Sequence, residues 1–486
     1  MANKELFKNI FSGIFGGLSN SKWSGYEGSF YRSVGIDAHS TPGILKIQQK
    51  LAKISSTTID SFCKVRIGAS DGSTLWFSET TGKIWREDSG SVTLVHTTTP
   101  AAGNAGCLGA FEYDGYIYWA TSARLHRKTI TDLSDWTGGV TEDWATFTNA
   151  NTSYHLMTVV SKKLFIGDGN LLAMVEDDSG HVFTANKLDL DAEYIITALD
   201  RYDIDVVIGT KINDKVSRCK VIRFDTVGSS WTSEDEIPEN GVNSFIRRDN
   251  DLFLQAGDTG RIFFYNGSKA VRHSRMPGDW DHEKKAVIYP HSSAMFKGVP
   301  VIGVSNISDT PASNEPLLLG VYSLGSYSRD YQDVLDLSFP ISTGNTTGNI
   351  KIGGILVKGN YILVAWQDGS TYGLDRIDYS NKYTSAYMET MILSEGAERV
   401  NKKTLSELIA NYVSLPADCN VKFKYKSKHD AAYSTSYLTT VDDTDRNQLR
   451  LDSNSIAEVM ALQLKIEFTV KVNNAPEVES ILYKLE

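Results

Sequence analysis

Two groups of aspartates are the residues of this chain that could carry out hydrolysis. Asp200, Asp203 and Asp205 lie close together, and Asp375 and Asp378 form a second group. Two carboxylates on either side of a glycosidic bond can act as acid and as base or nucleophile. Aspartates more often form turns, because their side chains accept hydrogen bonds from nearby backbone. Glycan cleavage therefore stays open as an alternative.

The segment Ser70 to Trp76 (SDGSTLW) contains Ser, Asp, Gly, Thr and Trp in the order found in the Asp-box of sialidase propellers. It resembles that motif with a different spacing. An Asp-box stabilises a turn, so this resemblance implies a β-hairpin and does not by itself indicate a sialidase.

The sequence predicts no metal site and no cofactor. The nine histidines form no HExxH motif, and His273 and His282 have no cysteine nearby. The glycines of stretches 13–17 and 353–354 lack the Lys-Ser/Thr of a phosphate-binding loop. The cysteines show no CxxC spacing, and we expect them to be buried thiols. They are Cys63, Cys107, Cys219 and Cys419.

Charge and hydropathy exclude several classes of partner. The formal net charge of the 486 residues is -10, which argues against a general nucleic-acid binder. We find no apolar run long enough to cross a membrane, and the first residues, MANKELFK, lack the apolar region of a secretory signal. We therefore expect synthesis in the host cytoplasm.

Tryptophans in long polar segments are candidates for contact surfaces. Trp136, Trp144, Trp231 and Trp280 lie between the apolar runs of the chain. An exposed tryptophan can anchor a protein partner or stack on a sugar ring. The alternative is that these side chains cover the ends of β-sheets.

A repeated hairpin pattern organises most of the chain. The segment Asp251 to Phe263 (DLFLQAGDTGRIF) has two alternating apolar runs around a Gly-containing turn, which predicts a β-hairpin. Similar segments recur at intervals of about 42 to 49 residues, followed by one interval of about 61. This period indicates an all-β fold, a β-propeller with about seven blades. The other hairpins are expected at 74–85, 116–125, 163–172, 206–224, 301–322 and 361–374.

The two ends of the chain predict additional parts. Residues 1–42 form an expected N-terminal arm and loop, residues 43–400 the propeller, and residues 401–486 a C-terminal β-sandwich domain. The alternating run 44–54 could pair with the last blade and close the ring. C-terminal strands are expected at 405–415, 421–425, 461–471 and 478–485.

Apolar residues crowd the arm, which we expect to be helical as far as Gly16-Gly17. The arm could dock on a neighbouring subunit, pack on its own domain, or touch a membrane surface. The candidate contact residues are Leu6, Ile10, Phe11, Ile14 and Phe15.

Both ends resemble the tail-associated β-propeller proteins of tailed bacteriophages. The resemblance rests on the opening GGLSNSKWSGYEGSFYRSVGIDAHSTPGILK, on the loosely similar blades, and on the ending that includes LQLKIEFT and PEVESI. It implies a structural, non-enzymatic virion protein placed in the tail as a hub, nozzle or tip. It also implies several copies around the tail axis, in contact with other tail or connector proteins. A host-glycan-binding module for attachment is the alternative reading, and a glycan-cleaving tail enzyme is a further one.

Overall fold

The computed structural model describes most of the chain, as separate stretches. The described residues are 8–11, 17–18, 29–37, 39–41, 43–54, 59–99, 106–150, 154–177, 180–212, 216–227, 230–276, 285–307, 319–325, 333–344, 349–393, 403–427, 432–441, 448–459 and 462–485. The chain divides into two units. The first contains Met1–Ala52, Val321–Gly344 and Ile377–Glu486, and the second contains Lys53–Gly320 and Asn345–Arg376.

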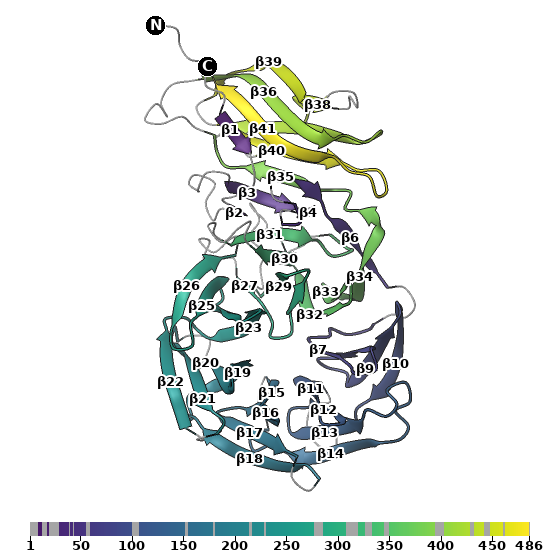
Figure 1. The fold of residues 1–486 in the computed structure, drawn as a ribbon, viewed down its shortest axis with the longest axis vertical. Coiled ribbons are helices and arrows are strands. Elements are labelled where there is room, and N and C mark those ends of the chain that lie inside the picture. Colours follow the sequence, from purple (N-terminus) through teal and green to yellow (C-terminus); the bar gives the residue numbers. More distant parts are fainter. Residues whose placement is uncertain are drawn as a thin grey trace. The chain divides into compact units, whose positions relative to one another are not determined.

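The second unit is a β-propeller whose blades follow one another around a ring (Figure 1). Five blades are antiparallel four-stranded sheets made of consecutive strands. They are β7 (Val65–Gly68), β8 (Thr74–Phe77), β9 (Lys83–Asp88) and β10 (Ser91–Thr97); β11 (Gly109–Tyr113), β12 (Tyr116–Ala120), β13 (Arg124–Thr129) and β14 (Val140–Thr146); β15 (Met157–Val160), β16 (Lys163–Asp168), β17 (Leu171–Glu176) and β18 (Val182–Asp189); β19 (Ile195–Tyr202), β20 (Asp205–Lys211), β21 (Cys219–Asp225) and β22 (Ser230–Ile237); and β23 (Val242–Arg248), β24 (Asp251–Ala256), β25 (Arg261–Tyr265) and β26 (Ala270–Arg275).

A sixth four-stranded blade closes the ring. Its strands are β32 (Ile350–Lys358), β33 (Tyr361–Asp368), β34 (Thr371–Lys382) and β6 (Gln49–Lys53), in that order. Just after β6, the Ile54 amide donates a hydrogen bond of 2.9 Å to the Leu374 carbonyl. The prediction that run 44–54 pairs with the last blade is therefore confirmed for β6, whereas Lys46–Ile47 pair with Ile36–Asp37 in a separate ribbon.

The expected count of about seven blades is wrong, because the propeller has six four-stranded blades. The long interval before β32 contains the hairpin of β28 (Ser293–Phe296) and β29 (Val299–Asn306), with the short strand β27 (Ala286–Val287) also paired to β29. The inner strand β28 lies between β23 and β32. After Gly320 the chain enters the first unit. β28 and β29 belong to a larger sheet, in which β29 is hydrogen-bonded to β30 (Gly320–Gly325), and not to a separate four-stranded blade.

The hairpins form where the sequence alternates, and tight turns connect them. In the turn between β11 and β12, Asp114 and Gly115 both have positive φ, +42° and +79°, as a two-residue type I′ turn requires. The hairpin predicted from Asp251 to Phe263 is β24 with the start of β25, in antiparallel register. The strands predicted around residues 74–85, 163–172 and 361–374 are also antiparallel hairpins.

Neighbouring sheets of the ring pack through a glycine on β16, β20 or β29 and a β-branched residue on the inner strand of the next sheet. A β-carbon added at Gly209 would lie 2.6 Å from Val242 Cγ1, and one at Gly303 would lie 2.3 Å from Ile352 Cγ2. Gly167 meets Ile196 in the same way. These distances are too short for real β-carbons. The glycines thus make room for the apolar side chains that join successive blades.

The first unit contains two larger sheets and a two-stranded ribbon. One sheet has the order β1 (Lys8–Phe11), β41 (Glu477–Leu485), β36 (Lys403–Ser414) and β39 (Gln448–Val459). The other belongs to an eleven-stranded sheet that begins with β27 and β29. It continues through β30 (Gly320–Gly325), β31 (Val334–Phe339), β3 (Ser29–Val34), β35 (Tyr387–Thr390), β40 (Leu462–Thr469) and β37 (Asn420–Ser427) to β38 (Thr439–Val441), with β2 (Gly17–Leu18) parallel to β3. The ribbon pairs β4 (Ile36–Asp37) with β5 (Lys46–Ile47).

One hydrophobic cluster connects the two sheets of the first unit. Leu408 and Ile481 from the first sheet are buried in the same cluster as Phe423, Leu464 and Ile466 from the second. All four predicted C-terminal strands are present, as β36, β37, β40 and β41. The sequence reading missed β39.

The described residues contain no α-helix. The expected helix in the N-terminal arm is therefore wrong at residues 8–11, where β1 pairs antiparallel with β41. The physical reason is that β41 offers a sheet edge, and extended backbone can satisfy its hydrogen bonds there. Among the described residues we find no helix that could span a membrane.

Candidate functional site

The inner strands of the propeller surround two adjoining cavities. The larger, about 490 Å³, is lined by residues of β7, β11, β15 and β19 and by Pro290 and His291. The smaller, about 310 Å³, is lined by residues of β19, β23 and β28. Arg66, Asp200 and Pro290 border both cavities. Cavities of this size can hold a small ligand.

Arg66 on β7 is held in place by backbone groups from two other strands. Its Nε donates to the Ile355 carbonyl at 2.7 Å, and one terminal nitrogen donates to the Ser293 carbonyl at 3.0 Å. Its stem passes over Gly354, where an added β-carbon would lie 2.6 Å from Arg66 Cγ. Burial lowers the pKa of Arg66 to about 10, so the guanidinium stays charged at neutral pH. The strand therefore presents a fixed positive charge at the cavity wall.

The other charged groups around the cavities are engaged with partners. Arg247 forms an ion pair with Asp200, with 3.0 Å between nitrogen and oxygen. Glu112 accepts a hydrogen bond of 2.9 Å from the Ser70 amide. Burial, and then the charge of Arg66, lower the pKa of His291 to about 3. His291 is therefore neutral at physiological pH, far from the pKa near 7 that suits a general acid or base.

The two predicted aspartate groups do not form a pair of free carboxylates. Asp205 is paired with Arg223 at 2.6 Å, and Asp200 with Arg247. Asp375 is fully buried and accepts a hydrogen bond of 2.6 Å from Trp366 Nε1. These contacts give Asp200, Asp205 and Asp375 structural roles. Asp378 accepts hydrogen bonds from the Ser380 amide and from Asn381, and Asp203, whose side chain is 74% exposed, lies 4.0 Å from Arg223.

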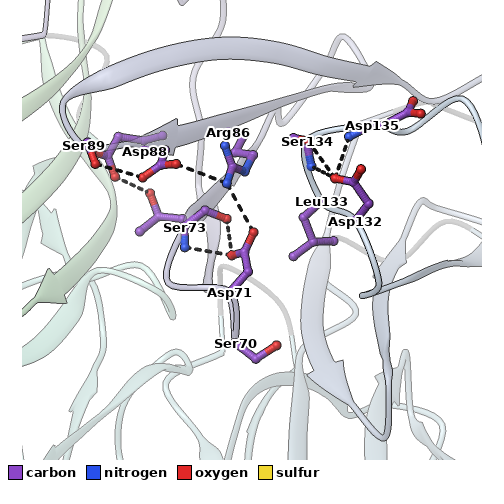
Figure 2. A network of polar contacts seen from close by, with 12 residues as sticks. Ser70, Asp71, Ser73, Arg86, Asp88, Ser89, Asp132, Leu133, Ser134 and Asp135 are labelled. Atoms are coloured by element: carbon purple, nitrogen blue, oxygen red, sulfur yellow. Dashed lines mark hydrogen bonds and ion pairs between the residues drawn. The ribbon is translucent and has the colours of Figure 1, made fainter.

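The segment Ser70 to Trp76 forms a hairpin turn between β7 and β8, as Figure 2 shows. The Asp71 carboxylate accepts hydrogen bonds from the Ser73 amide at 2.8 Å and from the Ser73 hydroxyl at 2.6 Å, and Arg86 approaches it at 3.3 Å. Burial opposes ionisation of Asp71, but these bonds outweigh it and lower the pKa. Asp132 makes the same contacts with Ser134 in the next blade. The Asp-box-like segment is thus a turn-stabilising device.

The tryptophans proposed as contact residues differ in their surroundings. Trp136 is buried, donates from Nε1 to the Leu133 carbonyl at 2.9 Å, and stacks on His96. Trp144 is partly buried on β14, and the Arg127 guanidinium lies 4.5 Å from its ring centroid. Trp231 on β22 is 42% exposed. Trp280 lies outside the described residues.

The N-terminal contact residues are only partly described. Leu6, Ile14 and Phe15 lie outside the described residues. Ile10 and Phe11 belong to β1, whose backbone pairs with β41 of the same chain. This arrangement uses the arm within its own chain, and docking of the arm on another subunit stays a prediction.

Two further sets of residues bear on the predictions about metals and thiols. Among the described residues, Asp114, Asp177 and His181 place one ligand atom each within 4.8 Å of one another. His181 Nε2 lies 2.8 Å from Asp114 Oδ2, so a hydrogen bond accounts for this contact without a metal. All four cysteines are free and buried, as predicted, and burial raises the pKa of the Cys63 thiol.

Sequence reasoning missed Arg66 and His291. The sequence contained a signal for Arg66. Buried and less buried residues alternate along β7, and since Val65 and Ile67 are buried, Arg66 lies on the opposite face of this inner strand. Its partner Gly354 lies almost 300 positions later in the chain. Only the closed ring brings the two together.

No protein-family model matches the chain, and no curated protein matches it. Many solved structures do. The β-propeller domain of Cps50 (Swd1) from Myceliophteria thermophila is 11% identical, with a TM-score of 0.45, over 66% of this chain and 98% of the other. Virginiamycin B lyase from Staphylococcus aureus is 13% identical, with a TM-score of 0.46, over 67% and 98%. The extracellular domain of BT4673 from B. thetaiotaomicron is 17% identical, with a TM-score of 0.45, over 69% of this chain and 40% of the other. These likenesses concern the fold alone.

Proposed function

We propose that this chain is a structural, non-enzymatic protein of a bacteriophage tail. Its propeller serves as a rigid scaffold that assembles around the tail axis, as part of a hub, nozzle or tip. The proposal rests on the resemblance of both chain ends to tail-associated propeller proteins and on the following feature of the fold.

The single observation that carries the proposal is the interleaving of the two units along the chain. The chain passes between them after Ala52, Gly320, Gly344 and Arg376. Each unit is therefore assembled from segments that lie far apart in the sequence. A chain whose two units share their segments in this way suits a structural part of an assembly.

The surroundings of the cavities support a non-enzymatic role. Asp200 is paired with Arg247, Asp375 is buried against Trp366, and His291 is neutral at physiological pH. The two carboxylates are thus engaged with partners, and the pKa of His291 lies far from the value near 7 that favours acid-base catalysis.

The first unit is, in this proposal, a β-sandwich that docks on other tail or connector proteins. The shared hydrophobic cluster of its two sheets supports a domain with its own core. The arm residues Leu6, Ile10, Phe11, Ile14 and Phe15 would contact a neighbouring copy in a homo-oligomer. The protein would then reside in the tail of the virion.

Light scattering tests this assembly. The mass of the full-length chain is measured beside a variant lacking residues 1–20, each alone and mixed with purified tail proteins. The proposal expects the full-length chain to form a ring or join the tail proteins, and the truncated chain to do so more weakly. Monomers that ignore the tail proteins in every mixture would contradict it.

Host-glycan binding is a second candidate function, and the exposure of Trp231 favours testing it. An exposed indole can stack on a sugar ring. Binding to host surface glycan that is lost in Trp231→Ala and kept in Trp136→Phe would support it, because Trp136 is buried and offers no free face.

A further inference from the structure

We propose that the smaller central cavity of the propeller binds an oxyanion, a carboxylate or phosphate group of a small molecule, with Arg66 as the anchoring residue. This inference is independent of the tail role. It starts from a charge that the protein itself leaves unbalanced.

Arg66 has no carboxylate partner among the described residues. Its two hydrogen bonds go to backbone carbonyls, which orient the guanidinium and leave its charge in place. A partly buried cation gains from a nearby anion, because the lower local dielectric strengthens their attraction. The wall of the cavity thus presents a charge that an anionic ligand would neutralise.

The donor groups of Arg66 match an oxyanion. A guanidinium has five N–H groups in a planar fork. The Ile355 and Ser293 carbonyls take two of them, which leaves three. Planar N–H groups can bind two oxygens of a carboxylate or phosphate at once, which an ammonium group cannot do with the same geometry.

Other parts of the propeller fix Arg66 in this orientation. The Arg66 stem occupies the space that a side chain at position 354 would need. Ser293, whose carbonyl accepts from Arg66, lies on β28 and lines the same cavity. A ligand therefore meets a guanidinium that is already held in place, which lowers the entropy cost of binding.

The balance of charge assigns the ligand to the smaller cavity. Its charged residues are Arg66, Arg247 and Asp200, and the last two neutralise each other. The larger cavity contains Glu112 in addition, which would repel an anion. The smaller cavity, about 310 Å³, therefore keeps one net positive charge.

Isothermal titration calorimetry at low ionic strength tests the proposal, with sodium acetate and inorganic phosphate as separate probes of the full-length chain. We expect at least one of them to bind, and Arg66→Gln to weaken the binding tenfold or more. Arg66→Lys keeps the positive charge but lacks the planar guanidinium. Its affinity for the probe should therefore lie between those of the unaltered chain and Arg66→Gln. The matched control is Arg86→Gln, because Arg86 is paired with Asp71 and does not line the cavity.

A second variant keeps the test decisive if Arg66→Gln fails to fold. Ala294→Leu places a larger side chain in the cavity and so reduces its free volume, without changing any charge, since Ala294 on β28 lines the cavity. The proposal expects this variant to lose binding as well. Absence of binding for both probes at millimolar concentration in the unaltered chain would overturn it, and so would equal binding by Ala294→Leu.

Discussion

The contact between Gly209 and Val242 allows a quantitative test of how successive blades are joined. Gly209 has an ordinary φ, so its role is to leave space and not to adopt a special backbone conformation. A β-carbon at this position would lie 2.6 Å from Val242 Cγ1, 2.7 Å from Val242 Cβ and 3.0 Å from Ala198 Cβ. Overpacking of this kind costs about 1–3 kcal/mol of folding free energy. We expect Gly209→Ala to destabilise the propeller by about this amount.

The double variant Gly209→Ala/Val242→Ala separates overpacking from other effects of the Gly209→Ala substitution. Val242→Ala alone should cost on the order of 2 kcal/mol, because it removes buried methyl groups. In the double variant the new methyl group occupies the space that Val242 has left. The two costs should therefore not add, and the coupling energy should exceed about 1 kcal/mol in the stabilising direction.

Urea unfolding followed by tryptophan fluorescence measures these changes in the propeller, because eight of the nine tryptophans belong to the second unit. Gly138→Ala is the matched control, since no atom lies within 4 Å of the added β-carbon and its φ is ordinary. It should change the free energy of unfolding by no more than about 1 kcal/mol. A Gly209→Ala variant as stable as the control, or strictly additive costs in the double variant, would refute the reasoning.

Three further predictions concern buried polar groups. Burial raises the pKa of Asp336 to about 7, although two serine hydroxyls donate to it. The folded unit thus holds a proton that the unfolded chain releases above about pH 4, and stability should fall by up to roughly 4 kcal/mol as pH rises to 7. Asp336→Asn should remove this slope in unfolding measured against pH. Burial lowers the pKa of His126 to about 4, so stability should instead fall as pH drops from about 6.5 to 4, and His126→Gln should flatten that fall. Asp375→Ala leaves the buried Trp366 N–H without its acceptor, which should cost about 1–3 kcal/mol in urea unfolding, and Asp375→Asn, which keeps an oxygen, should cost less.

The propeller was predictable because its signal is local. The alternation in Asp251 to Phe263 and the recurrence of similar hairpins specify strands, turns and a period without knowledge of distant contacts. The second half of run 44–54 was correctly assigned to the closing blade for the same reason, since it is an alternating strand ahead of the first hairpin. Its first half pairs with Ile36–Asp37, a contact that local alternation does not indicate. The C-terminal strands β36, β37, β40 and β41 follow from their own alternation.

The predictions of the blade count and of a helix in the arm were wrong, because contacts between distant chain segments determine the structure there. The hairpin predicted at 301–322 looked like one more blade, but its first strand β29 belongs to a larger sheet that continues through β30 and β31 after the chain enters the first unit. The apolar arm showed a helical spacing, yet residues 8–11 pair with β41, which lies at the other end of the sequence. A pairing partner more than 400 residues away leaves no trace in local periodicity.

The candidate site was harder to predict than the fold. Trp136 is a tryptophan in a polar segment, and the sequence alone does not distinguish an exposed ring from one stacked on His96. Arg66 appears in the sequence as an ordinary charged residue of a strand. Its importance depends on Gly354 and Ile355 of β32 and on Ser293 of β28, which only the folded ring brings close to it.

Peptide mass spectrometry of gradient-purified tailed particles tests the central claim most directly. The particles are prepared from a lysate in which this chain is produced with the other proteins encoded beside it, and the chain is quantified against the major tail proteins. The structural proposal predicts that the chain sediments with intact particles in a fixed, small copy number per tail. Recovery of the chain only in the soluble fraction, with complete tails that lack it, would contradict the proposal.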